Sequence, residues 1–225
     1  MFKTLSGLAL LAICFAWPSA RGQDYAVEVI EEGPDAEAIS PEIAALMADN
    51  GYRVKRGSRT AAEIWLCKEW KVDDSFVGSA ERLYPFTPGQ LIGVLHFSRR
   101  GSEFRNQTVS SGWYTLRFGL QPVDGNHEGT SPTRDFLLMV EASSDAANKE
   151  WSEDDLNQTS GQVAGTGHPA MLCLQPAAET SKEPGVRYDD FFDWWILQVQ
   201  GKGVGAKNQT KDLAMDVVVA GHASE

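Results

Sequence analysis

The stretch WYTLRFGL, residues 113–120, decides the fold class of this chain. Successive side chains of a β-strand point to opposite faces, so this pattern predicts a strand with one buried, apolar face. That face consists of Tyr114, Leu116, Phe118 and Leu120. The next apolar stretch, DFLLMVEA (residues 135–142), is apolar on both faces, which predicts a central strand that pairs antiparallel with the first.

Similar apolar segments, separated by turns with glycine or proline, continue in both directions along the chain. They are Ala26–Ile30, Tyr52–Lys55, Ala62–Cys67, Leu91–Phe97, Ala170–Leu174, Asp193–Gln200 and Leu213–Ala220. Short helices are predicted after two N-cap residues, Ser40 (residues 41–50) and Ser152 (residues 153–161). Strands do not alternate with helices, so we predict an all-β protein. The expected architecture is an antiparallel β-sandwich of about eight to nine strands with one or two short peripheral helices.

Residues 1–22 have the pattern of a signal peptide. Lys3 precedes an apolar run from Leu8 to Trp17, and Ala20-Arg21-Gly22 matches the small–x–small site of a signal peptidase. A lipobox at Leu11–Cys14 is the alternative, which the bulky residue before the cysteine disfavours. The run is shorter than the roughly 20 residues that span a bilayer, and no later segment reaches that length. We therefore expect an exported protein, periplasmic or extracellular, without a membrane span.

The remaining chain is expected to form an N-terminal segment with one short helix (residues 23–59) and a β-sandwich domain (residues 60–225).

The acidity of the whole sequence excludes one class of partner. The 31 Asp and Glu against 20 Lys and Arg give a net charge of −11, which repels phosphate backbones, so we expect no nucleic-acid partner. Cys67 and Cys173 lie in apolar segments; export permits a disulfide between them, and two buried thiols are the alternative.

The densest group of polar side chains is DGNHEGTSPTRDF, residues 124–136, between the two strands quoted first. Counted from Asp124, oxygen-bearing side chains fall at positions 1, 3 and 5 (Asp124, Asn126 and Glu128), glycine at 6 and Asp135 at 12. This spacing is close to that of a calcium-binding loop. It departs from that loop in having Glu at position 5, the shorter Asp at position 12, and strands in place of the flanking helices.

Histidine gives a second candidate site. His127 lies in this connection and His168 lies in the similar stretch GTGHP. With Asp124, Glu128 or Asp135, two imidazoles make a ligand set for zinc or an acid–base pair for hydrolysis. The interpretation that we favour is a connection without cofactor, whose polar side chains bind its own backbone. A divalent metal, zinc or calcium, belongs to the alternatives.

The stretch DDFFDWW, residues 189–195, is the richest in aromatic residues. Trp194 and Trp195 point to opposite faces of the predicted strand, so one of them leaves the core. We treat both as a candidate aromatic surface for a carbohydrate ligand, with burial in the core as the alternative.

The segments WYTLRFGLQPVDGNHEGTSPTRDFLLM (residues 113–139) and SGQVAGTGHPAMLCL (residues 160–174) resemble a family of exported bacterial β-rich proteins of unknown function, typical of planctomycete genomes. The resemblance covers residues 60–220 and implies export and a β-rich domain, without an activity. Together, these features predict an exported, non-catalytic protein that binds a protein or carbohydrate in the cell envelope or outside the cell. The alternative is a metal-dependent hydrolase that uses His127, His168 and the carboxylates of the connection.

Removal of the signal peptide after Gly22 would leave a chain that begins at Gln23. We expect intact-mass spectrometry of protein from its native host to give the mass of residues 23–225. A mass that still includes residues 1–17, or a diacylglyceryl group on Cys14, would contradict this prediction.

Overall fold

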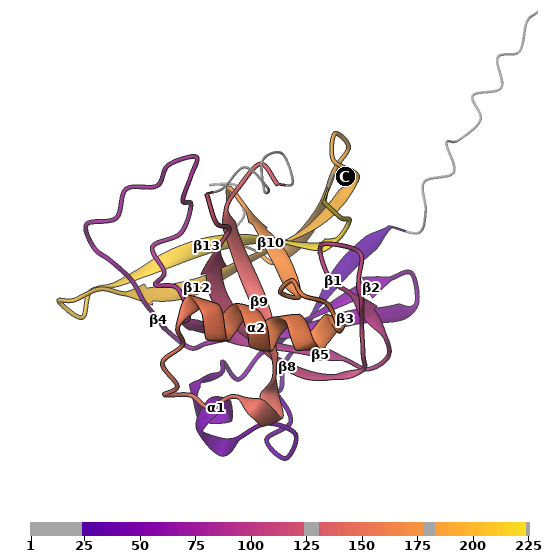
Figure 1. Ribbon diagram of the computed structural model, residues 1–225, viewed down its shortest axis with the longest axis horizontal. Helices are drawn as coiled ribbons and strands as arrows, with labels where there is room; N and C mark the ends of the chain where they lie inside the picture. The colour runs from indigo at the N-terminus through magenta and orange to yellow at the C-terminus, as the bar shows by residue number, and fades with distance from the viewer. Residues whose placement is uncertain (1–23, 124–130, 178–182, 224–225) are drawn as a thin grey trace, which may run out of the picture.

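A computed structural model of the chain describes residues 24–123, 131–177 and 183–223 (Figure 1). The prediction of a mostly β protein is confirmed. The strands are β1 (Tyr25–Ile30), β2 (Gly51–Arg56), β3 (Arg59–Leu66), β4 (Trp70–Lys71), β5 (Leu91–Phe97), β6 (Gly101–Ser102), β7 (Thr108–Val109), β8 (Gly112–Leu120), β9 (Asp135–Glu141), β10 (Met171–Gln175), β11 (Gly185–Asp189), β12 (Trp194–Val204) and β13 (Thr210–Ala220). The helices are α1 (Pro41–Leu46), α2 (Glu153–Ala164) and the short 3-10 helix η1 (Ala142–Ser144).

Each strand predicted from the sequence is present. β8 and β9 pair antiparallel from Tyr114↔Glu141 to Leu120↔Asp135, as expected for the strands that flank the long connection. The sequence pattern does not predict β4, β6, β7 and β11. The first three have two residues each, too few to show a period, and β11 (GVRYD) has no buried residue on either face.

The predicted antiparallel sandwich of about eight to nine strands is not confirmed. The described residues form one mixed sheet of 11 strands, in the order β1-β2-β3-β5-β8-β9-β10-β13-β12-β11 with β4 parallel to β12, and the small β6–β7 sheet. The cause is β10, because Met171–Cys173 pair with β9 whereas Leu174 and Gln175 pair with β13. Periodicity alone cannot distinguish one bent sheet from two stacked sheets, since buried and exposed positions alternate in both.

The sheet curls until its first and last strands approach each other. The rings of Tyr25 on β1 and Trp195 on β12 have centroids 5.4 Å apart, and Trp195 also contacts Tyr188 on β11, at 4.9 Å. The predicted N-terminal segment 23–59 takes part in this curl, because β1 pairs with β2 and β2 pairs with β3. Strands from the two ends of the described chain therefore lie next to each other.

Inside the curl, the segment between β4 and β5 fills the core with aromatic rings. Phe86 stacks on Tyr84 at 5.7 Å and lies edge-on to Phe118 at 5.5 Å. The Tyr84 hydroxyl donates to Gln175 O (2.7 Å) and accepts from Asp216 N (3.0 Å), where β10 passes from β9 to β13. Burial raises the pKa of Tyr84, so the phenol stays protonated and keeps its role as a donor. This segment therefore fixes the join between the two halves of the sheet.

Both predicted helices are present, with the predicted N-caps, but α1 ends at Leu46 and not at residue 50, because Met47 is extended and bridges Cys67. Ser40 accepts a hydrogen bond from Ile43 N at 3.2 Å, and Ser152 accepts one from Asp155 N at 3.1 Å. α2 continues past its predicted end at residue 161, because Gly165 is the residue that adopts the left-handed conformation of a C-cap (φ 65°). Within the described ranges, no helix is long and apolar enough to cross a membrane.

Outside the curl, α2 lies across β9 (Figure 1). It covers a second hydrophobic cluster, separate from the one inside the curl. This cluster consists of Phe104, Phe136, Leu138, Val140, Leu156, Cys173, Trp194, Ile196 and Val218. DFLLMVE in β9 is thus apolar on both faces because one face packs inside the curl and the other packs under the helix.

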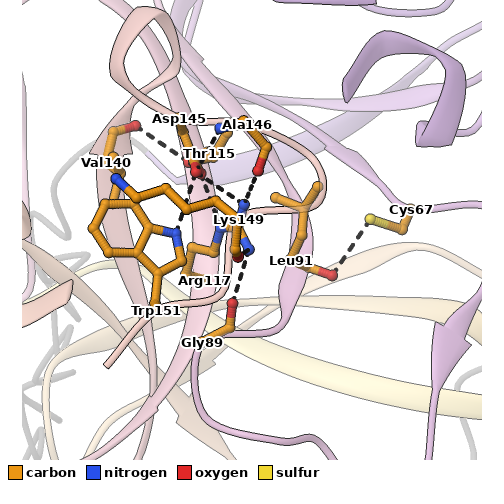
Figure 2. A network of polar contacts seen from close by, with 10 residues as sticks. All are labelled: Cys67, Gly89, Leu91, Thr115, Arg117, Val140, Asp145, Ala146, Lys149 and Trp151. Carbon is orange, nitrogen blue, oxygen red and sulfur yellow. Dashed lines mark hydrogen bonds and ion pairs between the residues drawn. The ribbon is translucent and has the colours of Figure 1, made fainter. Parts of the chain in front are cut away.

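A buried ion pair fixes the turn after β9 to the outer side of β8 (Figure 2). Arg117 is 2% exposed and binds Asp145 through two hydrogen bonds, Nε to Oδ2 at 2.8 Å and Nη2 to Oδ1 at 2.9 Å. The other polar contacts of the pair are with Gly89 O, Ala146 O, Lys149 O, Thr115 Oγ1, Trp151 Nε1 and Ala146 N. Two charges can remain buried here because this set of hydrogen bonds offsets their loss of hydration.

Removing either partner should leave an uncompensated charge in the interior. We expect Arg117→Met and Asp145→Asn each to lower the free energy of unfolding by about 3–5 kcal/mol, measured by urea denaturation. The exposed pair of Lys202 and Asp212, 3.4 Å apart, is the matched control. Asp212→Asn should cost less than about 1 kcal/mol. Equal losses at the buried and the exposed pair would show that the network does not hold the turn.

Candidate functional site

A cavity of about 440 Å³ opens where the end of β13 approaches β1, β3 and the turn after β5. Its size falls within the range of small-ligand sites, about 300–1,000 Å³. We call it the arginine cavity. Its cationic and ring-bearing lining residues include Tyr25, Arg56, Arg59, Arg99, Arg100 and His222.

Two turns supply the arginines. Arg56 ends β2 and Arg59 begins β3, and the two are paired across a tight turn in which Gly57 has a left-handed φ of 59°. Arg99 and Arg100 belong to the turn that follows β5. Because β3 and β5 are neighbours and run antiparallel, the start of β3 and the end of β5 lie at the same end of the sheet. All four cations are therefore brought to one end of the sheet.

The end of β13 supplies the opposite wall. Gly221 has a φ of 117°, a conformation that disfavours other residues, and it turns the chain after the strand. His222 O then accepts a hydrogen bond from Trp194 Nε1 (2.9 Å), and Ala223 N donates to Phe104 O (2.8 Å). These bonds hold the backbone of His222 in place, and His222 is among the residues that line the cavity.

The arginine cavity is positive although the protein is acidic. No described Asp or Glu lines it, and within the described chain no ion pair or hydrogen bond engages its four exposed guanidinium groups. Three arginines elsewhere do pair with carboxylates: Arg53 with Glu63 (2.7 Å), Arg117 with Asp145 (2.8 Å) and Arg187 with Asp216 (3.1 Å). The cavity thus concentrates unneutralised cations in a chain of net charge −11.

Guanidinium groups bind carboxylate, sulfate or phosphate through paired N–H···O bonds. Ser102 and Asn106 add polar groups to the lining, and Phe97 adds apolar surface. The guanidinium carbon of Arg56 lies 5.7 Å from the ring centroid of Tyr25, so an aromatic face supports one of the cations. This combination fits an organic anion that presents both acidic groups and some apolar surface.

Asp135, a predicted metal ligand, is an internal anchor in the structure. It is fully buried, and its two oxygens accept hydrogen bonds from Leu83 N and Tyr84 N, each at 3.0 Å. Burial raises the pKa of Asp135, although the two amide hydrogen bonds act in the opposite direction. Through these bonds Asp135 holds the segment before β5 inside the curl.

His168, the other described member of the predicted metal site, lies far from Asp135. The register Met171↔Leu138 places the residues before Met171 beside the Glu141 end of β9. Asp135 is at the opposite end of that strand, roughly 20 Å away at about 3.4 Å per residue. The structure therefore does not bring His168 and Asp135 together.

The other predicted ligands, Asp124, Asn126, His127 and Glu128, lie outside the described residues. In the part of the chain that the structure describes, no group of three His, Cys, Asp or Glu side chains could hold a metal ion. The calcium, zinc and hydrolase alternatives depend on residues 124–130 and stay predictions.

The two tryptophans of the predicted aromatic surface separate. Trp194 is 1% exposed and stacks on Phe192 in the cluster under α2, so it belongs to the core. Trp195 is half-buried and lies between Tyr25 and Tyr188. Only Trp195 therefore contributes to an accessible aromatic surface.

Cys67 and Cys173 are free and buried in different hydrophobic clusters, as the buried-thiol alternative describes. Burial raises the pKa of Cys67 to about 12 and also raises the pKa of Cys173. Both thiols are therefore protonated at neutral pH, a state in which cysteine is a poor nucleophile.

A second polar cluster follows a row across β2, β3, β5 and β8. Glu63 accepts from Arg53 Nε at 2.7 Å and bonds His96 Nδ1 at 2.9 Å, and the His96 ring stacks on Trp113 at 4.4 Å. Burial acts to raise the pKa of Glu63, but the hydrogen bonds from His96 and Arg53 outweigh it and lower the pKa below its ordinary value. The partners of Glu63 are cross-strand neighbours, so we assign this row a structural role.

The sequence interpretation missed the arginine cavity, because its cations come from separate turns. A signal is nevertheless visible. VKRGSRTAA (residues 54–62) and FSRRGS (residues 97–102) each carry arginines without a single acidic residue, in a chain where acids outnumber bases by 31 to 20. In such segments no acidic residue lies nearby in the sequence to neutralise the arginines.

Comparison with known proteins finds no protein-family model, curated protein sequence or solved structure that matches this chain. The resemblance to exported planctomycete-type proteins therefore stays a prediction, and the function is argued from the site itself.

The lowered pKa of Glu63 predicts a pH-dependent contribution to stability. A carboxyl group whose pKa is lower in the folded protein stabilises it above the ordinary value of 4.5, and this contribution is lost as the pH falls through the folded pKa. We expect Glu63→Gln to lower the free energy of unfolding at pH 7, and the gap to wild type to close below pH 4.5. Urea denaturation across this range measures the gap.

Glu28→Gln, at a half-exposed carboxylate paired with Lys55, is the control and should show a smaller gap. A gap for Glu63→Gln that does not change with pH would contradict the prediction.

Proposed function

We propose that this protein is an exported, non-catalytic binding protein whose ligand is an organic anion held in the arginine cavity. The observation that carries the proposal is the group of four exposed guanidinium groups, without carboxylate partners in the described chain, around a cavity of about 440 Å³. Export is supported by the signal-peptide pattern of residues 1–22.

The charge distribution supports a ligand in this position. Like charges that gather without counter-ions repel one another, and an anion between them relieves that repulsion. The guanidinium fork adds directional hydrogen bonds to a carboxylate or sulfate. The N–H groups of Arg117 already donate hydrogen bonds within the protein. Those of the cavity arginines, Arg56, Arg59, Arg99 and Arg100, remain available to a ligand.

The acidic remainder of the protein restricts which anions can bind. At physiological salt, charges farther apart than about 8 Å are largely screened from one another. A compact anion in the cavity therefore interacts mainly with the nearby arginines, whereas a long polyanion also meets the negative surface around them. The arrangement favours a ligand with a local acidic group, carried by a carbohydrate or by a protein partner.

We expect isothermal titration calorimetry to detect binding of citrate by the wild-type protein, and to show it weakening as salt is raised from 0.1 to 1 M, because the screening length falls from about 10 to about 3 Å. Replacing Arg59 and Arg99 together by Ser should weaken binding at least tenfold, because the loss of about one charge-assisted hydrogen bond lowers the affinity by about that factor.

The matched control is Lys71→Ser with Lys207→Ser, which changes the net charge equally at the opposite end of β12 and β13 from the cavity. These substitutions should leave citrate affinity within about twofold. Absence of citrate binding, or equal weakening by both double variants, would overturn the proposal.

A further inference from the structure

A row of three aromatic rings begins in the arginine cavity and continues outside it. Tyr25 lines the cavity, its ring lies 5.4 Å from that of Trp195, and Trp195 lies 4.9 Å from Tyr188. The three rings come from β1, β12 and β11, so the closing of the sheet assembles the row. The guanidinium of Arg56 lies over Tyr25, so cation and row are contiguous. We call these three residues the aromatic row.

The aromatic row differs from the aromatic core. Tyr188 is 36% exposed, and Tyr25 and Trp195 are half-buried, whereas the neighbouring Trp194 is 1% exposed. Trp195 pairs with Ala220, which also lines the cavity, so the row and the cavity share a boundary. A ligand anchored at the arginines therefore has aromatic surface directly beside it.

Charge changes sign along the row. The Tyr25 end carries the arginines, whereas the Tyr188 end is flanked by Asp190 and Asp193, and by Asp189, which pairs with Arg187 at 3.6 Å. The Tyr188 hydroxyl donates to Asp193 Oδ1 at 2.8 Å, which places one of these carboxylates beside the row. The end away from the cavity thus favours neutral groups, and the cavity end favours an acidic one.

On the basis of the proposed function, we propose that the ligand is an oligosaccharide with one acidic sugar at its end. The acidic group, a carboxylate or a sulfate, binds the guanidinium groups of the cavity. The neutral sugars that follow lay their C–H faces on Trp195 and Tyr188, since aromatic rings bind apolar faces and tolerate polar edges. A nucleic acid, whose bases also stack on aromatic rings, carries a phosphate every ~3.4 Å of strand and would place charge beside the aspartates.

The test compares five probes by calorimetry on the full exported chain. Four are a xylo-oligosaccharide with one terminal glucuronate, the same oligosaccharide without it, free glucuronate, and a single-stranded oligonucleotide. The same neutral oligosaccharide with a terminal sulfate in place of the glucuronate distinguishes the two kinds of acidic group. We expect an acid-capped oligosaccharide to bind at least fivefold more tightly than either the neutral oligosaccharide or free glucuronate, because only it uses cavity and row together.

Tyr188→Ala should weaken binding of the acid-capped oligosaccharide about fivefold, and Trp195→Ala serves as a second variant at the row. The control is Phe191→Ala in the same hairpin, which removes an aromatic ring that is 84% exposed and outside the row, and it should leave the affinity unchanged.

Different results would overturn different claims. If free glucuronate binds as tightly as the capped oligosaccharides, or if Phe191→Ala and Tyr188→Ala weaken binding equally, the saccharide inference fails while anion binding stands. Tightest binding of the oligonucleotide would also overturn the saccharide inference. If citrate does not bind, the proposed function itself fails.

Discussion

The division of β10 between two neighbours is the constraint on which the rest of the structure depends. Met171–Cys173 hydrogen-bond to β9, and Leu174 and Gln175 hydrogen-bond to β13, so one strand belongs to both halves of the sheet. The Tyr84 hydroxyl bonds Gln175 O and Asp216 N at this join, and Asp135 holds the backbone of Tyr84. These bonds make the chain form one curled sheet, with a core inside and a second core under α2.

The proposed binding site is a consequence of this curl. The arginines come from the ends of β2, β3 and β5, while His222 follows β13 and Trp195 lies on β12. These strands are far apart in the order of the sheet, and only its closure brings them to one place. The arginine cavity and the aromatic row both lie where the first strands of the sheet approach its last strands, so the curl of the sheet explains why they are in contact.

Polar residues in this protein serve two distinct purposes. Arg117, Asp145 and Asp135 are buried, and their charged groups have partners from backbone and side chains, so they stabilise turns and loops. The cavity arginines are exposed and have no such partners within the described residues. Residue type does not separate the two groups, because an arginine that anchors a turn and one that binds a ligand carry the same chemistry. Only the identity of the neighbours separates them.

The sequence by itself determined the mostly β character, the predicted strands, the pairing of β8 with β9, and both helix N-caps. These features depend on the period of apolar residues and on capping contacts within a few residues, which are local. The tertiary structure alone decided that the strands form one sheet, that Asp135 faces backbone amides, and that the arginines meet across from His222. Each of these depends on which distant strands become neighbours, and the alternation of a strand is the same whichever neighbour it has.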